Sequence, residues 1–222
     1  MDSEHNHISG EKIKFQYWSR NLPHLFDVNK PIFITYRMKY DLPKQVMEDY
    51  TRRVDEYNKE LDALGTKERE EKKRIKDAKF FTWFDELLAK APDVPNLLQR
   101  DDIREVIAES FHYFDNQRYK LLAYSIMPNH IHVLILPKTK ENGDIFPIQH
   151  IIYTWKKYTA LAINRLIGKT GNFWQKEGYD HLVRDDSELA NVLNYILMNP
   201  VKAGLVQQWQ EWKGNYLSQD LI

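Results

Sequence analysis

The sequence predicts an α+β fold: a ferredoxin-like antiparallel sheet of order β-α-β-β-α-β, followed by a C-terminal helix and interrupted by an inserted helical hairpin. Three observations predict this fold. A segment rich in β-branched and aromatic residues at 31–38 and two segments around a Pro-Asn turn at 119–127 and 130–137 predict strands, and 178–184 is a short strand candidate. Segments with helical spacing of apolar residues lie between and after them. A densely charged stretch, about 43–91, follows the first predicted strand.

Length and composition fit one soluble globular domain. The chain has 222 residues, of which 42% are hydrophobic and 29% charged, as is ordinary for a protein with its own core. We expect residues 1–12 to form a flexible tail and residues 13–222 a single domain carrying the insertion. The polar N-terminus lacks the apolar segment of a signal peptide, and no apolar run approaches the ~20 residues that span a bilayer. We therefore expect a cytoplasmic protein with no membrane partner.

Charge and cysteine content narrow the function classes. There are no cysteines, so disulfides and thiolate metal sites are excluded, and a metal would need nitrogen and oxygen ligands. Lys+Arg and Asp+Glu number 32 each, for a net charge of zero. A dedicated duplex-DNA binder is usually more basic, although a local basic groove can coexist with an acidic appendage. The absence of a glycine-rich phosphate fingerprint after any predicted strand excludes a dinucleotide-binding dehydrogenase.

The first half of the chain supplies one strand and the insertion. PIFITYRM, residues 31–38, has the composition of a strand. In the insertion, Glu, Lys and Arg recur with helical spacing, with a break at Gly65 and an end at Ala91-Pro92. Acidic and basic residues alternate there, which is typical of a solvated helix surface rather than of a nucleic-acid contact.

The second half begins with a helix and a hairpin. Asp101 and Asp102 begin the helix, because acidic side chains favour a helix N-terminus. YKLLAYSIM (119–127) and HIHVLILP (130–137) flank a Pro-Asn turn. This arrangement predicts two antiparallel strands.

Two helices and a strand complete the predicted fold. Residues 148–167 have helical periodicity, and residues 178–184 form a short strand candidate. Asp186 or Ser187 then caps a helix that ends at Pro200. We expect this last helix to cover the sheet face that the other helices leave open.

Two histidines begin the strand at 130–137. Side chains alternate along a strand, so His130 and His132 share one face, while Ile131 and Val133 point to a core on the other. Two imidazoles so placed could share one metal ion, with Mg²⁺ or Mn²⁺ completing its sphere with oxygen ligands. The alternative is two hydrogen-bonded, partly exposed histidines at a strand end, because such spacing is common by chance.

The final helix offers two partners for these histidines. Tyr195 and Asn199 are four residues apart, so they share one helix face. The Asn199 carbonyl oxygen could be a third, hard ligand. The Tyr195 phenol could attack phosphorus and form a phosphotyrosine. Taken without the histidines, Tyr195 would be read as a core residue and Asn199 as a helix-end residue before Pro200.

Three ordered blocks carry a family resemblance. MPNHIHVLI, FWQKEGYDHLVR and YILMNPVKAGLV resemble the REP-associated tyrosine transposases and their IS200-like insertion-sequence relatives, the single-tyrosine HUH transposases, where HUH stands for His-hydrophobic-His. The similarity covers roughly residues 30–40 and 100–206. Chance agreement of three ordered blocks is improbable.

The resemblance implies a ferredoxin-like fold and a metal-dependent endonuclease and strand transferase that acts on single-stranded, hairpin-forming DNA. His130 and His132 match the HUH pair, Tyr195 the nucleophile and Asn199 the polar metal ligand. In the family, attack leaves a 5′-phosphotyrosine and a free 3′-OH, and the step later reverses onto a new DNA end. The family includes monomers and also dimers whose active sites are completed by residues of the partner subunit. The resemblance therefore allows a homodimer without requiring one.

Candidate DNA contacts combine cations with aromatic rings, as single-strand binding requires. They are Lys156, Lys157, Trp174, Arg184 and Lys202, with His181 as a candidate accessory residue. A core position is the favoured alternative for Trp155 and Phe173, and a structural hydrogen bond is the favoured alternative for His181.

Two other functions compete with strand transfer. One is a host-adopted nucleic-acid-binding module without catalysis. The other is a metal-dependent hydrolytic nuclease, in which water attacks and Tyr195 is structural. A covalent protein–DNA adduct separates the transferase from both. The sequence does not specify the DNA target, the metal used in cells or the role of the insertion. Nor does it show whether the protein still belongs to an active mobile element.

Overall fold

The structure is a computed structural model that describes residues 15–19, 23–27, 30–41, 44–62, 82–83, 85, 95–144, 146–176 and 178–221. Its strands are β1 (Phe15–Ser19), β2 (Pro23–Asp27), β3 (Ile32–Arg37), β4 (Tyr119–Ile126), β5 (His130–Pro137), β6 (Tyr179–Leu182) and β7 (Asn215–Leu217). Its helices are α1 (Lys44–Asp62), α3 (Asp101–His112), α4 (Ile148–Ile167) and α5 (Asp186–Lys202), with short 3₁₀ turns at Leu97–Gln99, Trp209–Glu211 and Gln219–Leu221. The predicted tail at 1–12 lies outside the described residues.

The main sheet confirms the predicted fold class. Its order is β6-β3-β5-β4-β7, and every neighbouring pair is antiparallel. Without β7, the order β6-β3-β5-β4 is the ferredoxin-like arrangement, because the first and third strands of the β-α-β-β-α-β unit lie in the centre. The edge strand β7 and the separate β1-β2 hairpin were not predicted.

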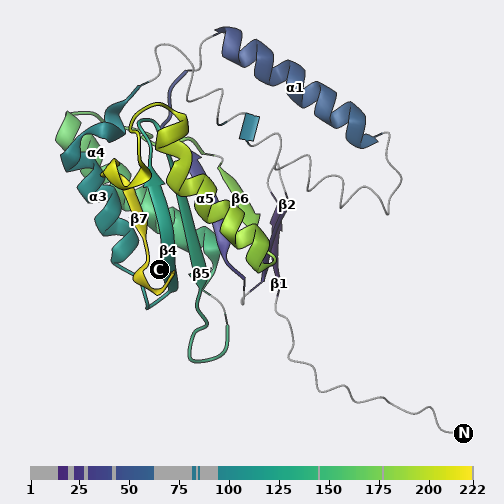
Figure 1. The fold of residues 1–222 in the computed structure, drawn as a ribbon, viewed down its shortest axis with the longest axis vertical. Coiled ribbons are helices and arrows are strands. Elements are labelled where there is room, and N and C mark those ends of the chain that lie inside the picture. The colour runs from purple at the N-terminus through teal and green to yellow at the C-terminus, as the bar shows by residue number, and fades with distance from the viewer. Residues whose placement is uncertain are drawn as a thin grey trace, which may run out of the picture.

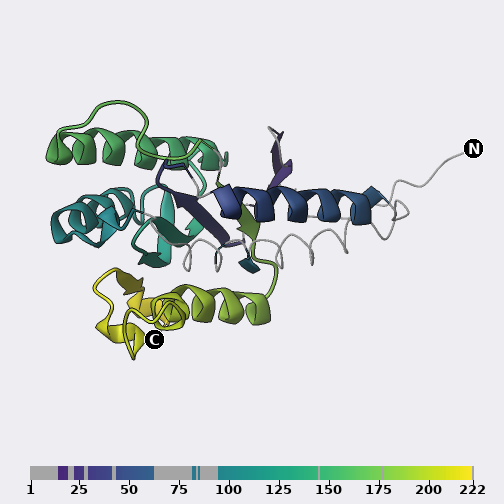
Figure 2. The same ribbon diagram turned by 90° about the horizontal axis from the view of Figure 1, so that it is seen from above.

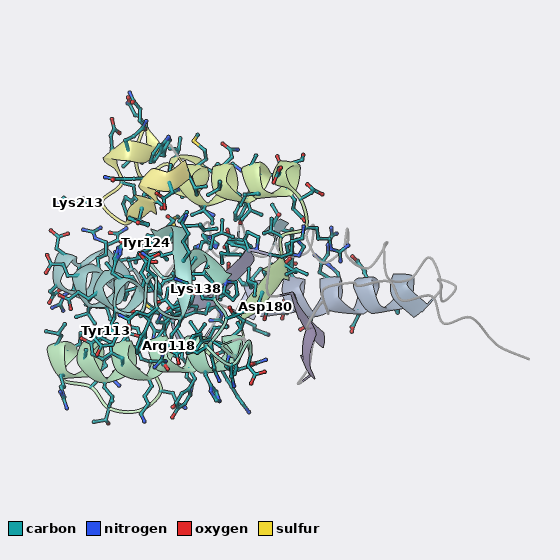
Figure 3. All side chains as sticks on the ribbon, turned by 90° about the horizontal axis from the view of Figure 1, so that it is seen from below. Tyr113, Arg118, Tyr124, Lys138, Asp180 and Lys213 are labelled. Atoms are coloured by element: carbon teal, nitrogen blue, oxygen red, sulfur yellow. The ribbon has the colours of Figure 1, made fainter. Side chains whose placement is uncertain are left out.

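Helices cover both faces of the sheet (Figures 1 and 2). α3 and α4 lie on one face, and α5 lies on the other, as expected for the final helix. Side chains fill both spaces between the sheet and its helical layers (Figure 3). Side chains alternate between the two faces along a strand, and those of β3, β4 and β5 are buried on both faces. Each face therefore needs a covering layer, which gives the three-layer arrangement.

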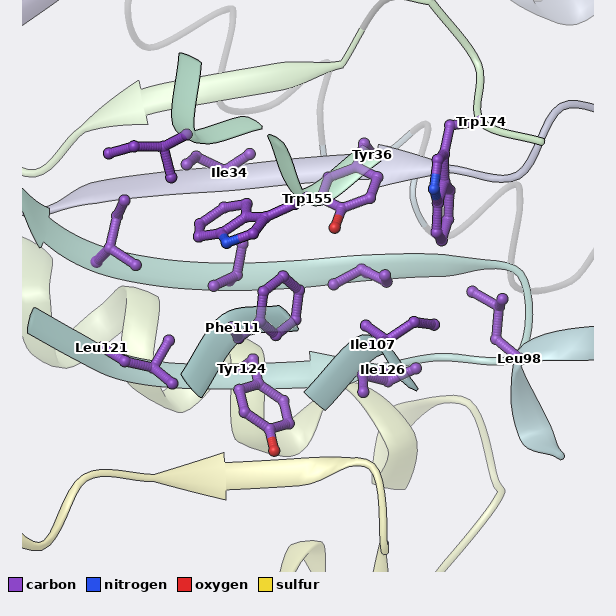
Figure 4. Packing of buried hydrophobic residues seen from close by; sticks show 14 of the residues in the cluster. Ile34, Tyr36, Leu98, Ile107, Phe111, Leu121, Tyr124, Ile126, Trp155 and Trp174 are labelled. Carbon is purple, nitrogen blue, oxygen red and sulfur yellow. The ribbon is translucent and has the colours of Figure 1, made fainter. Parts of the chain in front are cut away.

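The larger core lies between the sheet and the α3/α4 layer (Figure 4). Trp155 of α4 is 1% exposed, and its indole Nε1 donates to the hydroxyl of Tyr119, 3.0 Å away. The Tyr119 hydroxyl in turn donates to the backbone oxygen of Phe111 at 2.6 Å. The smaller core, under α5, is built around Phe33 and Ile196.

α5 differs from the prediction at both ends. Its N-cap is Asp185, whose side chain accepts a hydrogen bond from the backbone of Glu188 at 2.8 Å, so neither Asp186 nor Ser187 is the cap. The helix also continues through Pro200 to Lys202. Pro200 has no N–H to donate to the backbone oxygen of Ile196, but its φ is helical, and only two residues of the helix follow it.

The insertion is described in part. α1 confirms the first predicted helix, and its Lys44–Glu48 ion pair, at 3.6 Å, joins two exposed side chains. Residues 82–83 and 85 are also helical. Most of the second predicted helix lies outside the described residues, so the helical hairpin stays a prediction. Within the described ranges, no helix has the length and apolarity to cross a membrane.

Candidate active site

The two histidines at the start of β5 are buried beneath α5. His130 is 1% and His132 0% exposed, which rules out the partly exposed pair that the sequence left open. Their Nε2 atoms lie 3.1 Å apart. Ile131 and Val133 belong to the core on the opposite face, as alternation predicts.

Neighbouring side chains fix both rings. His130 Nδ1 lies 2.5 Å from Asn129 Oδ1, and an amide oxygen can only accept, so Nδ1 carries the proton. His132 Nδ1 lies 2.7 Å from the hydroxyl of Thr35, its register partner on β3. A ring whose Nδ1 is protonated presents a lone pair at Nε2. His130 therefore presents a lone pair at Nε2, and His132 Nε2, 3.1 Å away, is turned toward the same point.

α5 brings the predicted tyrosine and asparagine to this point. Asn199 is 6% exposed, and its Nδ2 lies 3.0 Å from His132 Nε2. The Tyr195 ring packs edge-on against His132, with centroids 5.4 Å apart. The structure thus brings together the four predicted site residues. Asn199 presents its amide nitrogen, so its carbonyl oxygen would face the histidines only after a half-turn of the amide.

A carboxylate from the insertion completes the cluster, and sequence reasoning missed it. Asp85 is 4% exposed, with Oδ1 3.2 Å from His130 Nε2 and Oδ2 3.4 Å from His132 Nε2. Its Oδ2 accepts hydrogen bonds from the Tyr195 hydroxyl and from Asn199 Nδ2. One signal was available: Asp85 directly follows an aromatic run, FFTWF, in an otherwise charged segment.

Burial and mutual attraction set the charges of this cluster. Burial raises the pKa of Asp85, but attraction to His132 and His130 in their protonated forms, together with the hydrogen bond from the Tyr195 hydroxyl, outweighs it, so the pKa falls well below its usual range. Burial lowers the pKa of His130 to about 4; Asp85 opposes this, and His132 adds to it. At neutral pH the site therefore contains a carboxylate beside a neutral imidazole.

The donor set fits a divalent cation. Donor atoms of Asp85, His130 and His132 all lie within 4.8 Å of one another. Within the described part of the chain, buried Asp85 Oδ1 accepts no hydrogen bond, although it lies beside an imidazole nitrogen that presents a lone pair. Two such electron-rich atoms repel unless a cation lies between them. Nitrogen and carboxylate ligands suit Mn²⁺ and, with water, Mg²⁺.

The predicted DNA contacts are divided between the two faces. Lys202 lies on the site side, with Nζ 5.3 Å from the centroid of the Tyr195 ring. Arg184 is exposed and directly precedes the N-cap of α5. Lys156 and Lys157 are on α4, across the sheet from the histidines, and Lys156 Nζ donates to the backbone oxygen of Gln175 at 3.0 Å.

Three further predicted residues have structural contacts. Trp174 is 6% exposed and its Nε1 donates to the Thr159 hydroxyl at 2.8 Å, so its prediction as a stacking platform is wrong: the ring fills the core. Trp155 and Phe173 are also core residues, as favoured. His181 Nε2 lies 2.8 Å from Glu188 Oε1, which is the structural hydrogen bond expected for it.

Comparisons with known proteins confirm the resemblance. Residues 96–199 match the family model described as "Transposase IS200 like". A putative REP-associated tyrosine transposase of Haemophilus influenzae is 33% identical over 111 residues, 46% of this chain and 61% of that protein. A REP-associated tyrosine transposase of Escherichia coli is 26% identical over 104 residues, 46% of this chain and 57% of that protein. The matches thus span about three fifths of the relatives' length.

A solved structure is more distantly similar. It is described as "Structure of the REP associates tyrosine transposase bound to a REP hairpin" and shares 14% sequence identity, with a TM-score of 0.46 over 94% of this chain and 82% of that chain. This likeness is too distant to carry an argument about the site.

Proposed function

Because residues 96–199 match the IS200-like transposases, we propose that this protein is a metal-dependent single-stranded DNA endonuclease and strand transferase, with Tyr195 as the nucleophile. His130, His132 and Asn199 would bind Mg²⁺ or Mn²⁺. The substrate would be single-stranded DNA that forms hairpins, as the resemblance implies.

The convergence of β5 and α5 carries this proposal. Two strand residues and two helix residues, 63 or more positions apart in the chain, meet at one buried point. Burying two imidazoles and an amide together is costly unless hydrogen bonds or a bound cation compensate for their lost hydration. A structural role for Tyr195 and Asn199 would not require that they face the histidine pair. An attacking phenol beside a cation-binding pair does require it.

The chemistry follows from these groups. The Tyr195 oxygen attacks the scissile phosphorus, the bond from phosphorus to the 3′-oxygen breaks, and the 3′-oxygen leaves with a proton as a free 3′-OH. The product is a 5′-phosphotyrosine. The phenolic proton departs as the new bond forms, and Asp85 Oδ2 accepts that hydrogen bond in the structure. A bound divalent ion would supply charge neutralisation at the phosphate.

A tyrosine nucleophile suits transfer better than hydrolysis. The phosphotyrosine is still a phosphodiester, so one such bond is exchanged for another. A new 3′-OH can therefore attack the phosphotyrosine, release the Tyr195 phenol and join two DNA ends without a nucleotide cofactor. Lys202 beside the Tyr195 ring and exposed Arg184 are candidates for contacts with the DNA backbone.

The test is adduct formation on a denaturing gel. Wild-type protein is mixed with labelled single-stranded hairpin DNAs and Mn²⁺ or Mg²⁺, beside a chelator control and the Tyr195→Phe variant. Tyr179→Phe is the matched control, because Tyr179, like Tyr195, packs edge-on against Phe33. We expect a slow-migrating adduct that needs metal and Tyr195 but not the Tyr179 hydroxyl.

The other outcomes separate the competing functions. Cleavage that survives Tyr195→Phe would favour a hydrolytic nuclease that uses water. Binding of the hairpins without cleavage by the wild-type protein would favour a nucleic-acid-binding module.

A further inference from the structure

We propose that the inserted segment supplies a protein ligand to the metal site: the Asp85 carboxylate binds the cation together with His130 and His132. This inference rests on the proposed metal-dependent function and adds to it. Residue 85 lies outside the span matched by the family model, which begins at residue 96. The ligand would therefore come from the part of this chain that is additional to the matched region.

The distances around Asp85 are those of neighbouring ligands. Adjacent ligands of an octahedral ion with bonds of about 2.1 Å lie about 3.0 Å apart. The two Nε2 atoms are 3.1 Å apart, and Asp85 Oδ1 is 3.2 Å from His130 Nε2. Asp85 Oδ2 is 3.4 Å from His132 Nε2. Each imidazole nitrogen thus has one carboxylate oxygen at about ligand spacing, and the three residues offer donor atoms that all lie within 4.8 Å of one another.

The two carboxylate oxygens have different surroundings. Oδ2 already accepts hydrogen bonds from Tyr195 and Asn199. Oδ1 is buried and, among the residues that the structure describes, accepts none. Burial of an ionised oxygen without a donor is costly, and a shared cation would remove that cost. Oδ1 is therefore the ligand atom, and Oδ2 remains available to hold the Tyr195 hydroxyl and the Asn199 amide.

This arrangement links the insertion to both functional groups. With Asp85 in place, a segment carried by the insertion contacts the cation site and the proposed nucleophile at once. Asn199 presents its nitrogen to Asp85 Oδ2, so Asp85 supplies an oxygen ligand with the Asn199 amide as it stands, and Asn199 would add its own oxygen after a half-turn of that amide. The carboxylate is a harder, charged ligand than an amide, which favours Mn²⁺ and Mg²⁺ over metals that prefer nitrogen.

The experiment measures metal binding rather than cleavage. Mn²⁺ affinity is determined by titration calorimetry for wild-type protein, Asp85→Asn and Asp55→Asn. Asn at 85 keeps the shape and one acceptor for Tyr195 but loses the charge. Asp55→Asn removes a charge from an exposed position of α1 in the same insertion. We expect Asp85→Asn to weaken Mn²⁺ binding at least tenfold and Asp55→Asn to leave it unchanged.

Cobalt spectroscopy separates ligation from simple charge attraction. The visible spectrum of bound Co²⁺ depends on the number and type of its ligands, so Asp85→Asn should change it. Equal Mn²⁺ affinity in wild type and Asp85→Asn would overturn the inference. So would weaker affinity with an unchanged Co²⁺ spectrum, because the carboxylate would then act through charge alone. If wild-type protein bound no Mn²⁺, the metal-dependent function itself would fail.

A measurement on the wild-type protein covers the case in which Asp85→Asn does not fold. Protein labelled with ¹³C at the aspartate carboxyl carbons is loaded with Mn²⁺, and the ¹³C couplings are measured by electron–nuclear double resonance. We expect a strong coupling from one directly bound carboxylate. Its absence from a Mn²⁺-loaded sample would overturn the inference.

Discussion

At the scale of single residues, His132 is the best-connected group of the site. Its Nδ1 contacts Thr35, its Nε2 faces Asn199, and Phe33 stacks on its ring with centroids 5.7 Å apart. Because Thr35 is its register partner on β3, the sheet itself determines the ring orientation. As the metal ligand proposed above, a ring held this way would bind a cation without first losing rotational freedom.

Loss of the Thr35 hydroxyl should therefore weaken metal binding. We expect Thr35→Val, which keeps the shape, to lower Mn²⁺ affinity about tenfold, as measured by calorimetry. Ser125→Ala is the control, because Ser125 is the register partner of His132 on β4 and is also buried, but its hydroxyl contacts the sulfur of Met127 instead. Equal losses in the two variants would contradict a specific role for the Thr35 hydrogen bond.

His130 should make the metal-free protein sensitive to acid. Burial lowers its folded-state pKa to about 4 from an ordinary 6.5, so the unfolded chain takes up a proton that the folded protein resists. Above pH 6.5 the imidazole is neutral in both states and costs the folded protein nothing. As the pH falls from 6.5 toward about 4, the free energy of unfolding decreases by about 3 kcal/mol in total. Urea unfolding at pH 7.5 and 4.5 measures this loss.

The variant His130→Gln isolates this effect, since glutamine does not titrate. We expect its loss of unfolding free energy between the two pH values to be smaller than that of the wild type by about 2–3 kcal/mol. A loss of equal size in both proteins would show that other groups cause the acid sensitivity.

At the scale of elements, local signals explain what the sequence predicted. The β4-β5 hairpin needs only alternation and a Pro-Asn turn, and α4 ends at Gly168, which adopts φ 65. Asp85 and β7 could not be found this way. A three-residue edge strand gains its stability from pairing with β4, and Asp85 gains its role from contacts with residues up to 114 positions away.

The N-terminus of α5 depends on Asp185, a short-range feature that prediction placed one or two residues too late. Replacement of this N-cap by alanine should cost about 1 kcal/mol, because the Glu188 amide loses its acceptor. Asp186→Ala is the control: it removes the same charge from the same turn but leaves the cap bond in place. Thermal unfolding should show a larger decrease in Tm for Asp185→Ala, and equal decreases would assign the effect to charge alone.

At the scale of the whole molecule, the sheet separates stability from chemistry. The larger core, with Trp155, lies on the α3/α4 face, and the polar cluster of Asp85, His130 and His132 lies on the α5 face. The alternation of residues along β5 predicted that its histidines lie on one face of the sheet and its core residues on the other. What it could not predict is that the insertion also contributes to the α5 face, because no local pattern shows where a long insertion returns to the sheet.

This separation predicts that stability and metal affinity can be changed independently. Trp155→Phe removes buried volume and the indole donor to Tyr119, so it should lower the free energy of unfolding by about 1–3 kcal/mol in urea titrations. Leu161→Ala, at a 54% exposed position of the same helix, should change it far less.

At temperatures where Trp155→Phe is folded, its Mn²⁺ affinity should equal that of the wild type, since the substituted ring lies across the sheet from the histidines. Thr35→Val should show the converse, with a larger effect on affinity than on unfolding. A parallel fall in both quantities for Trp155→Phe would mean that the sheet transmits packing defects to the site, and that the two faces are energetically coupled.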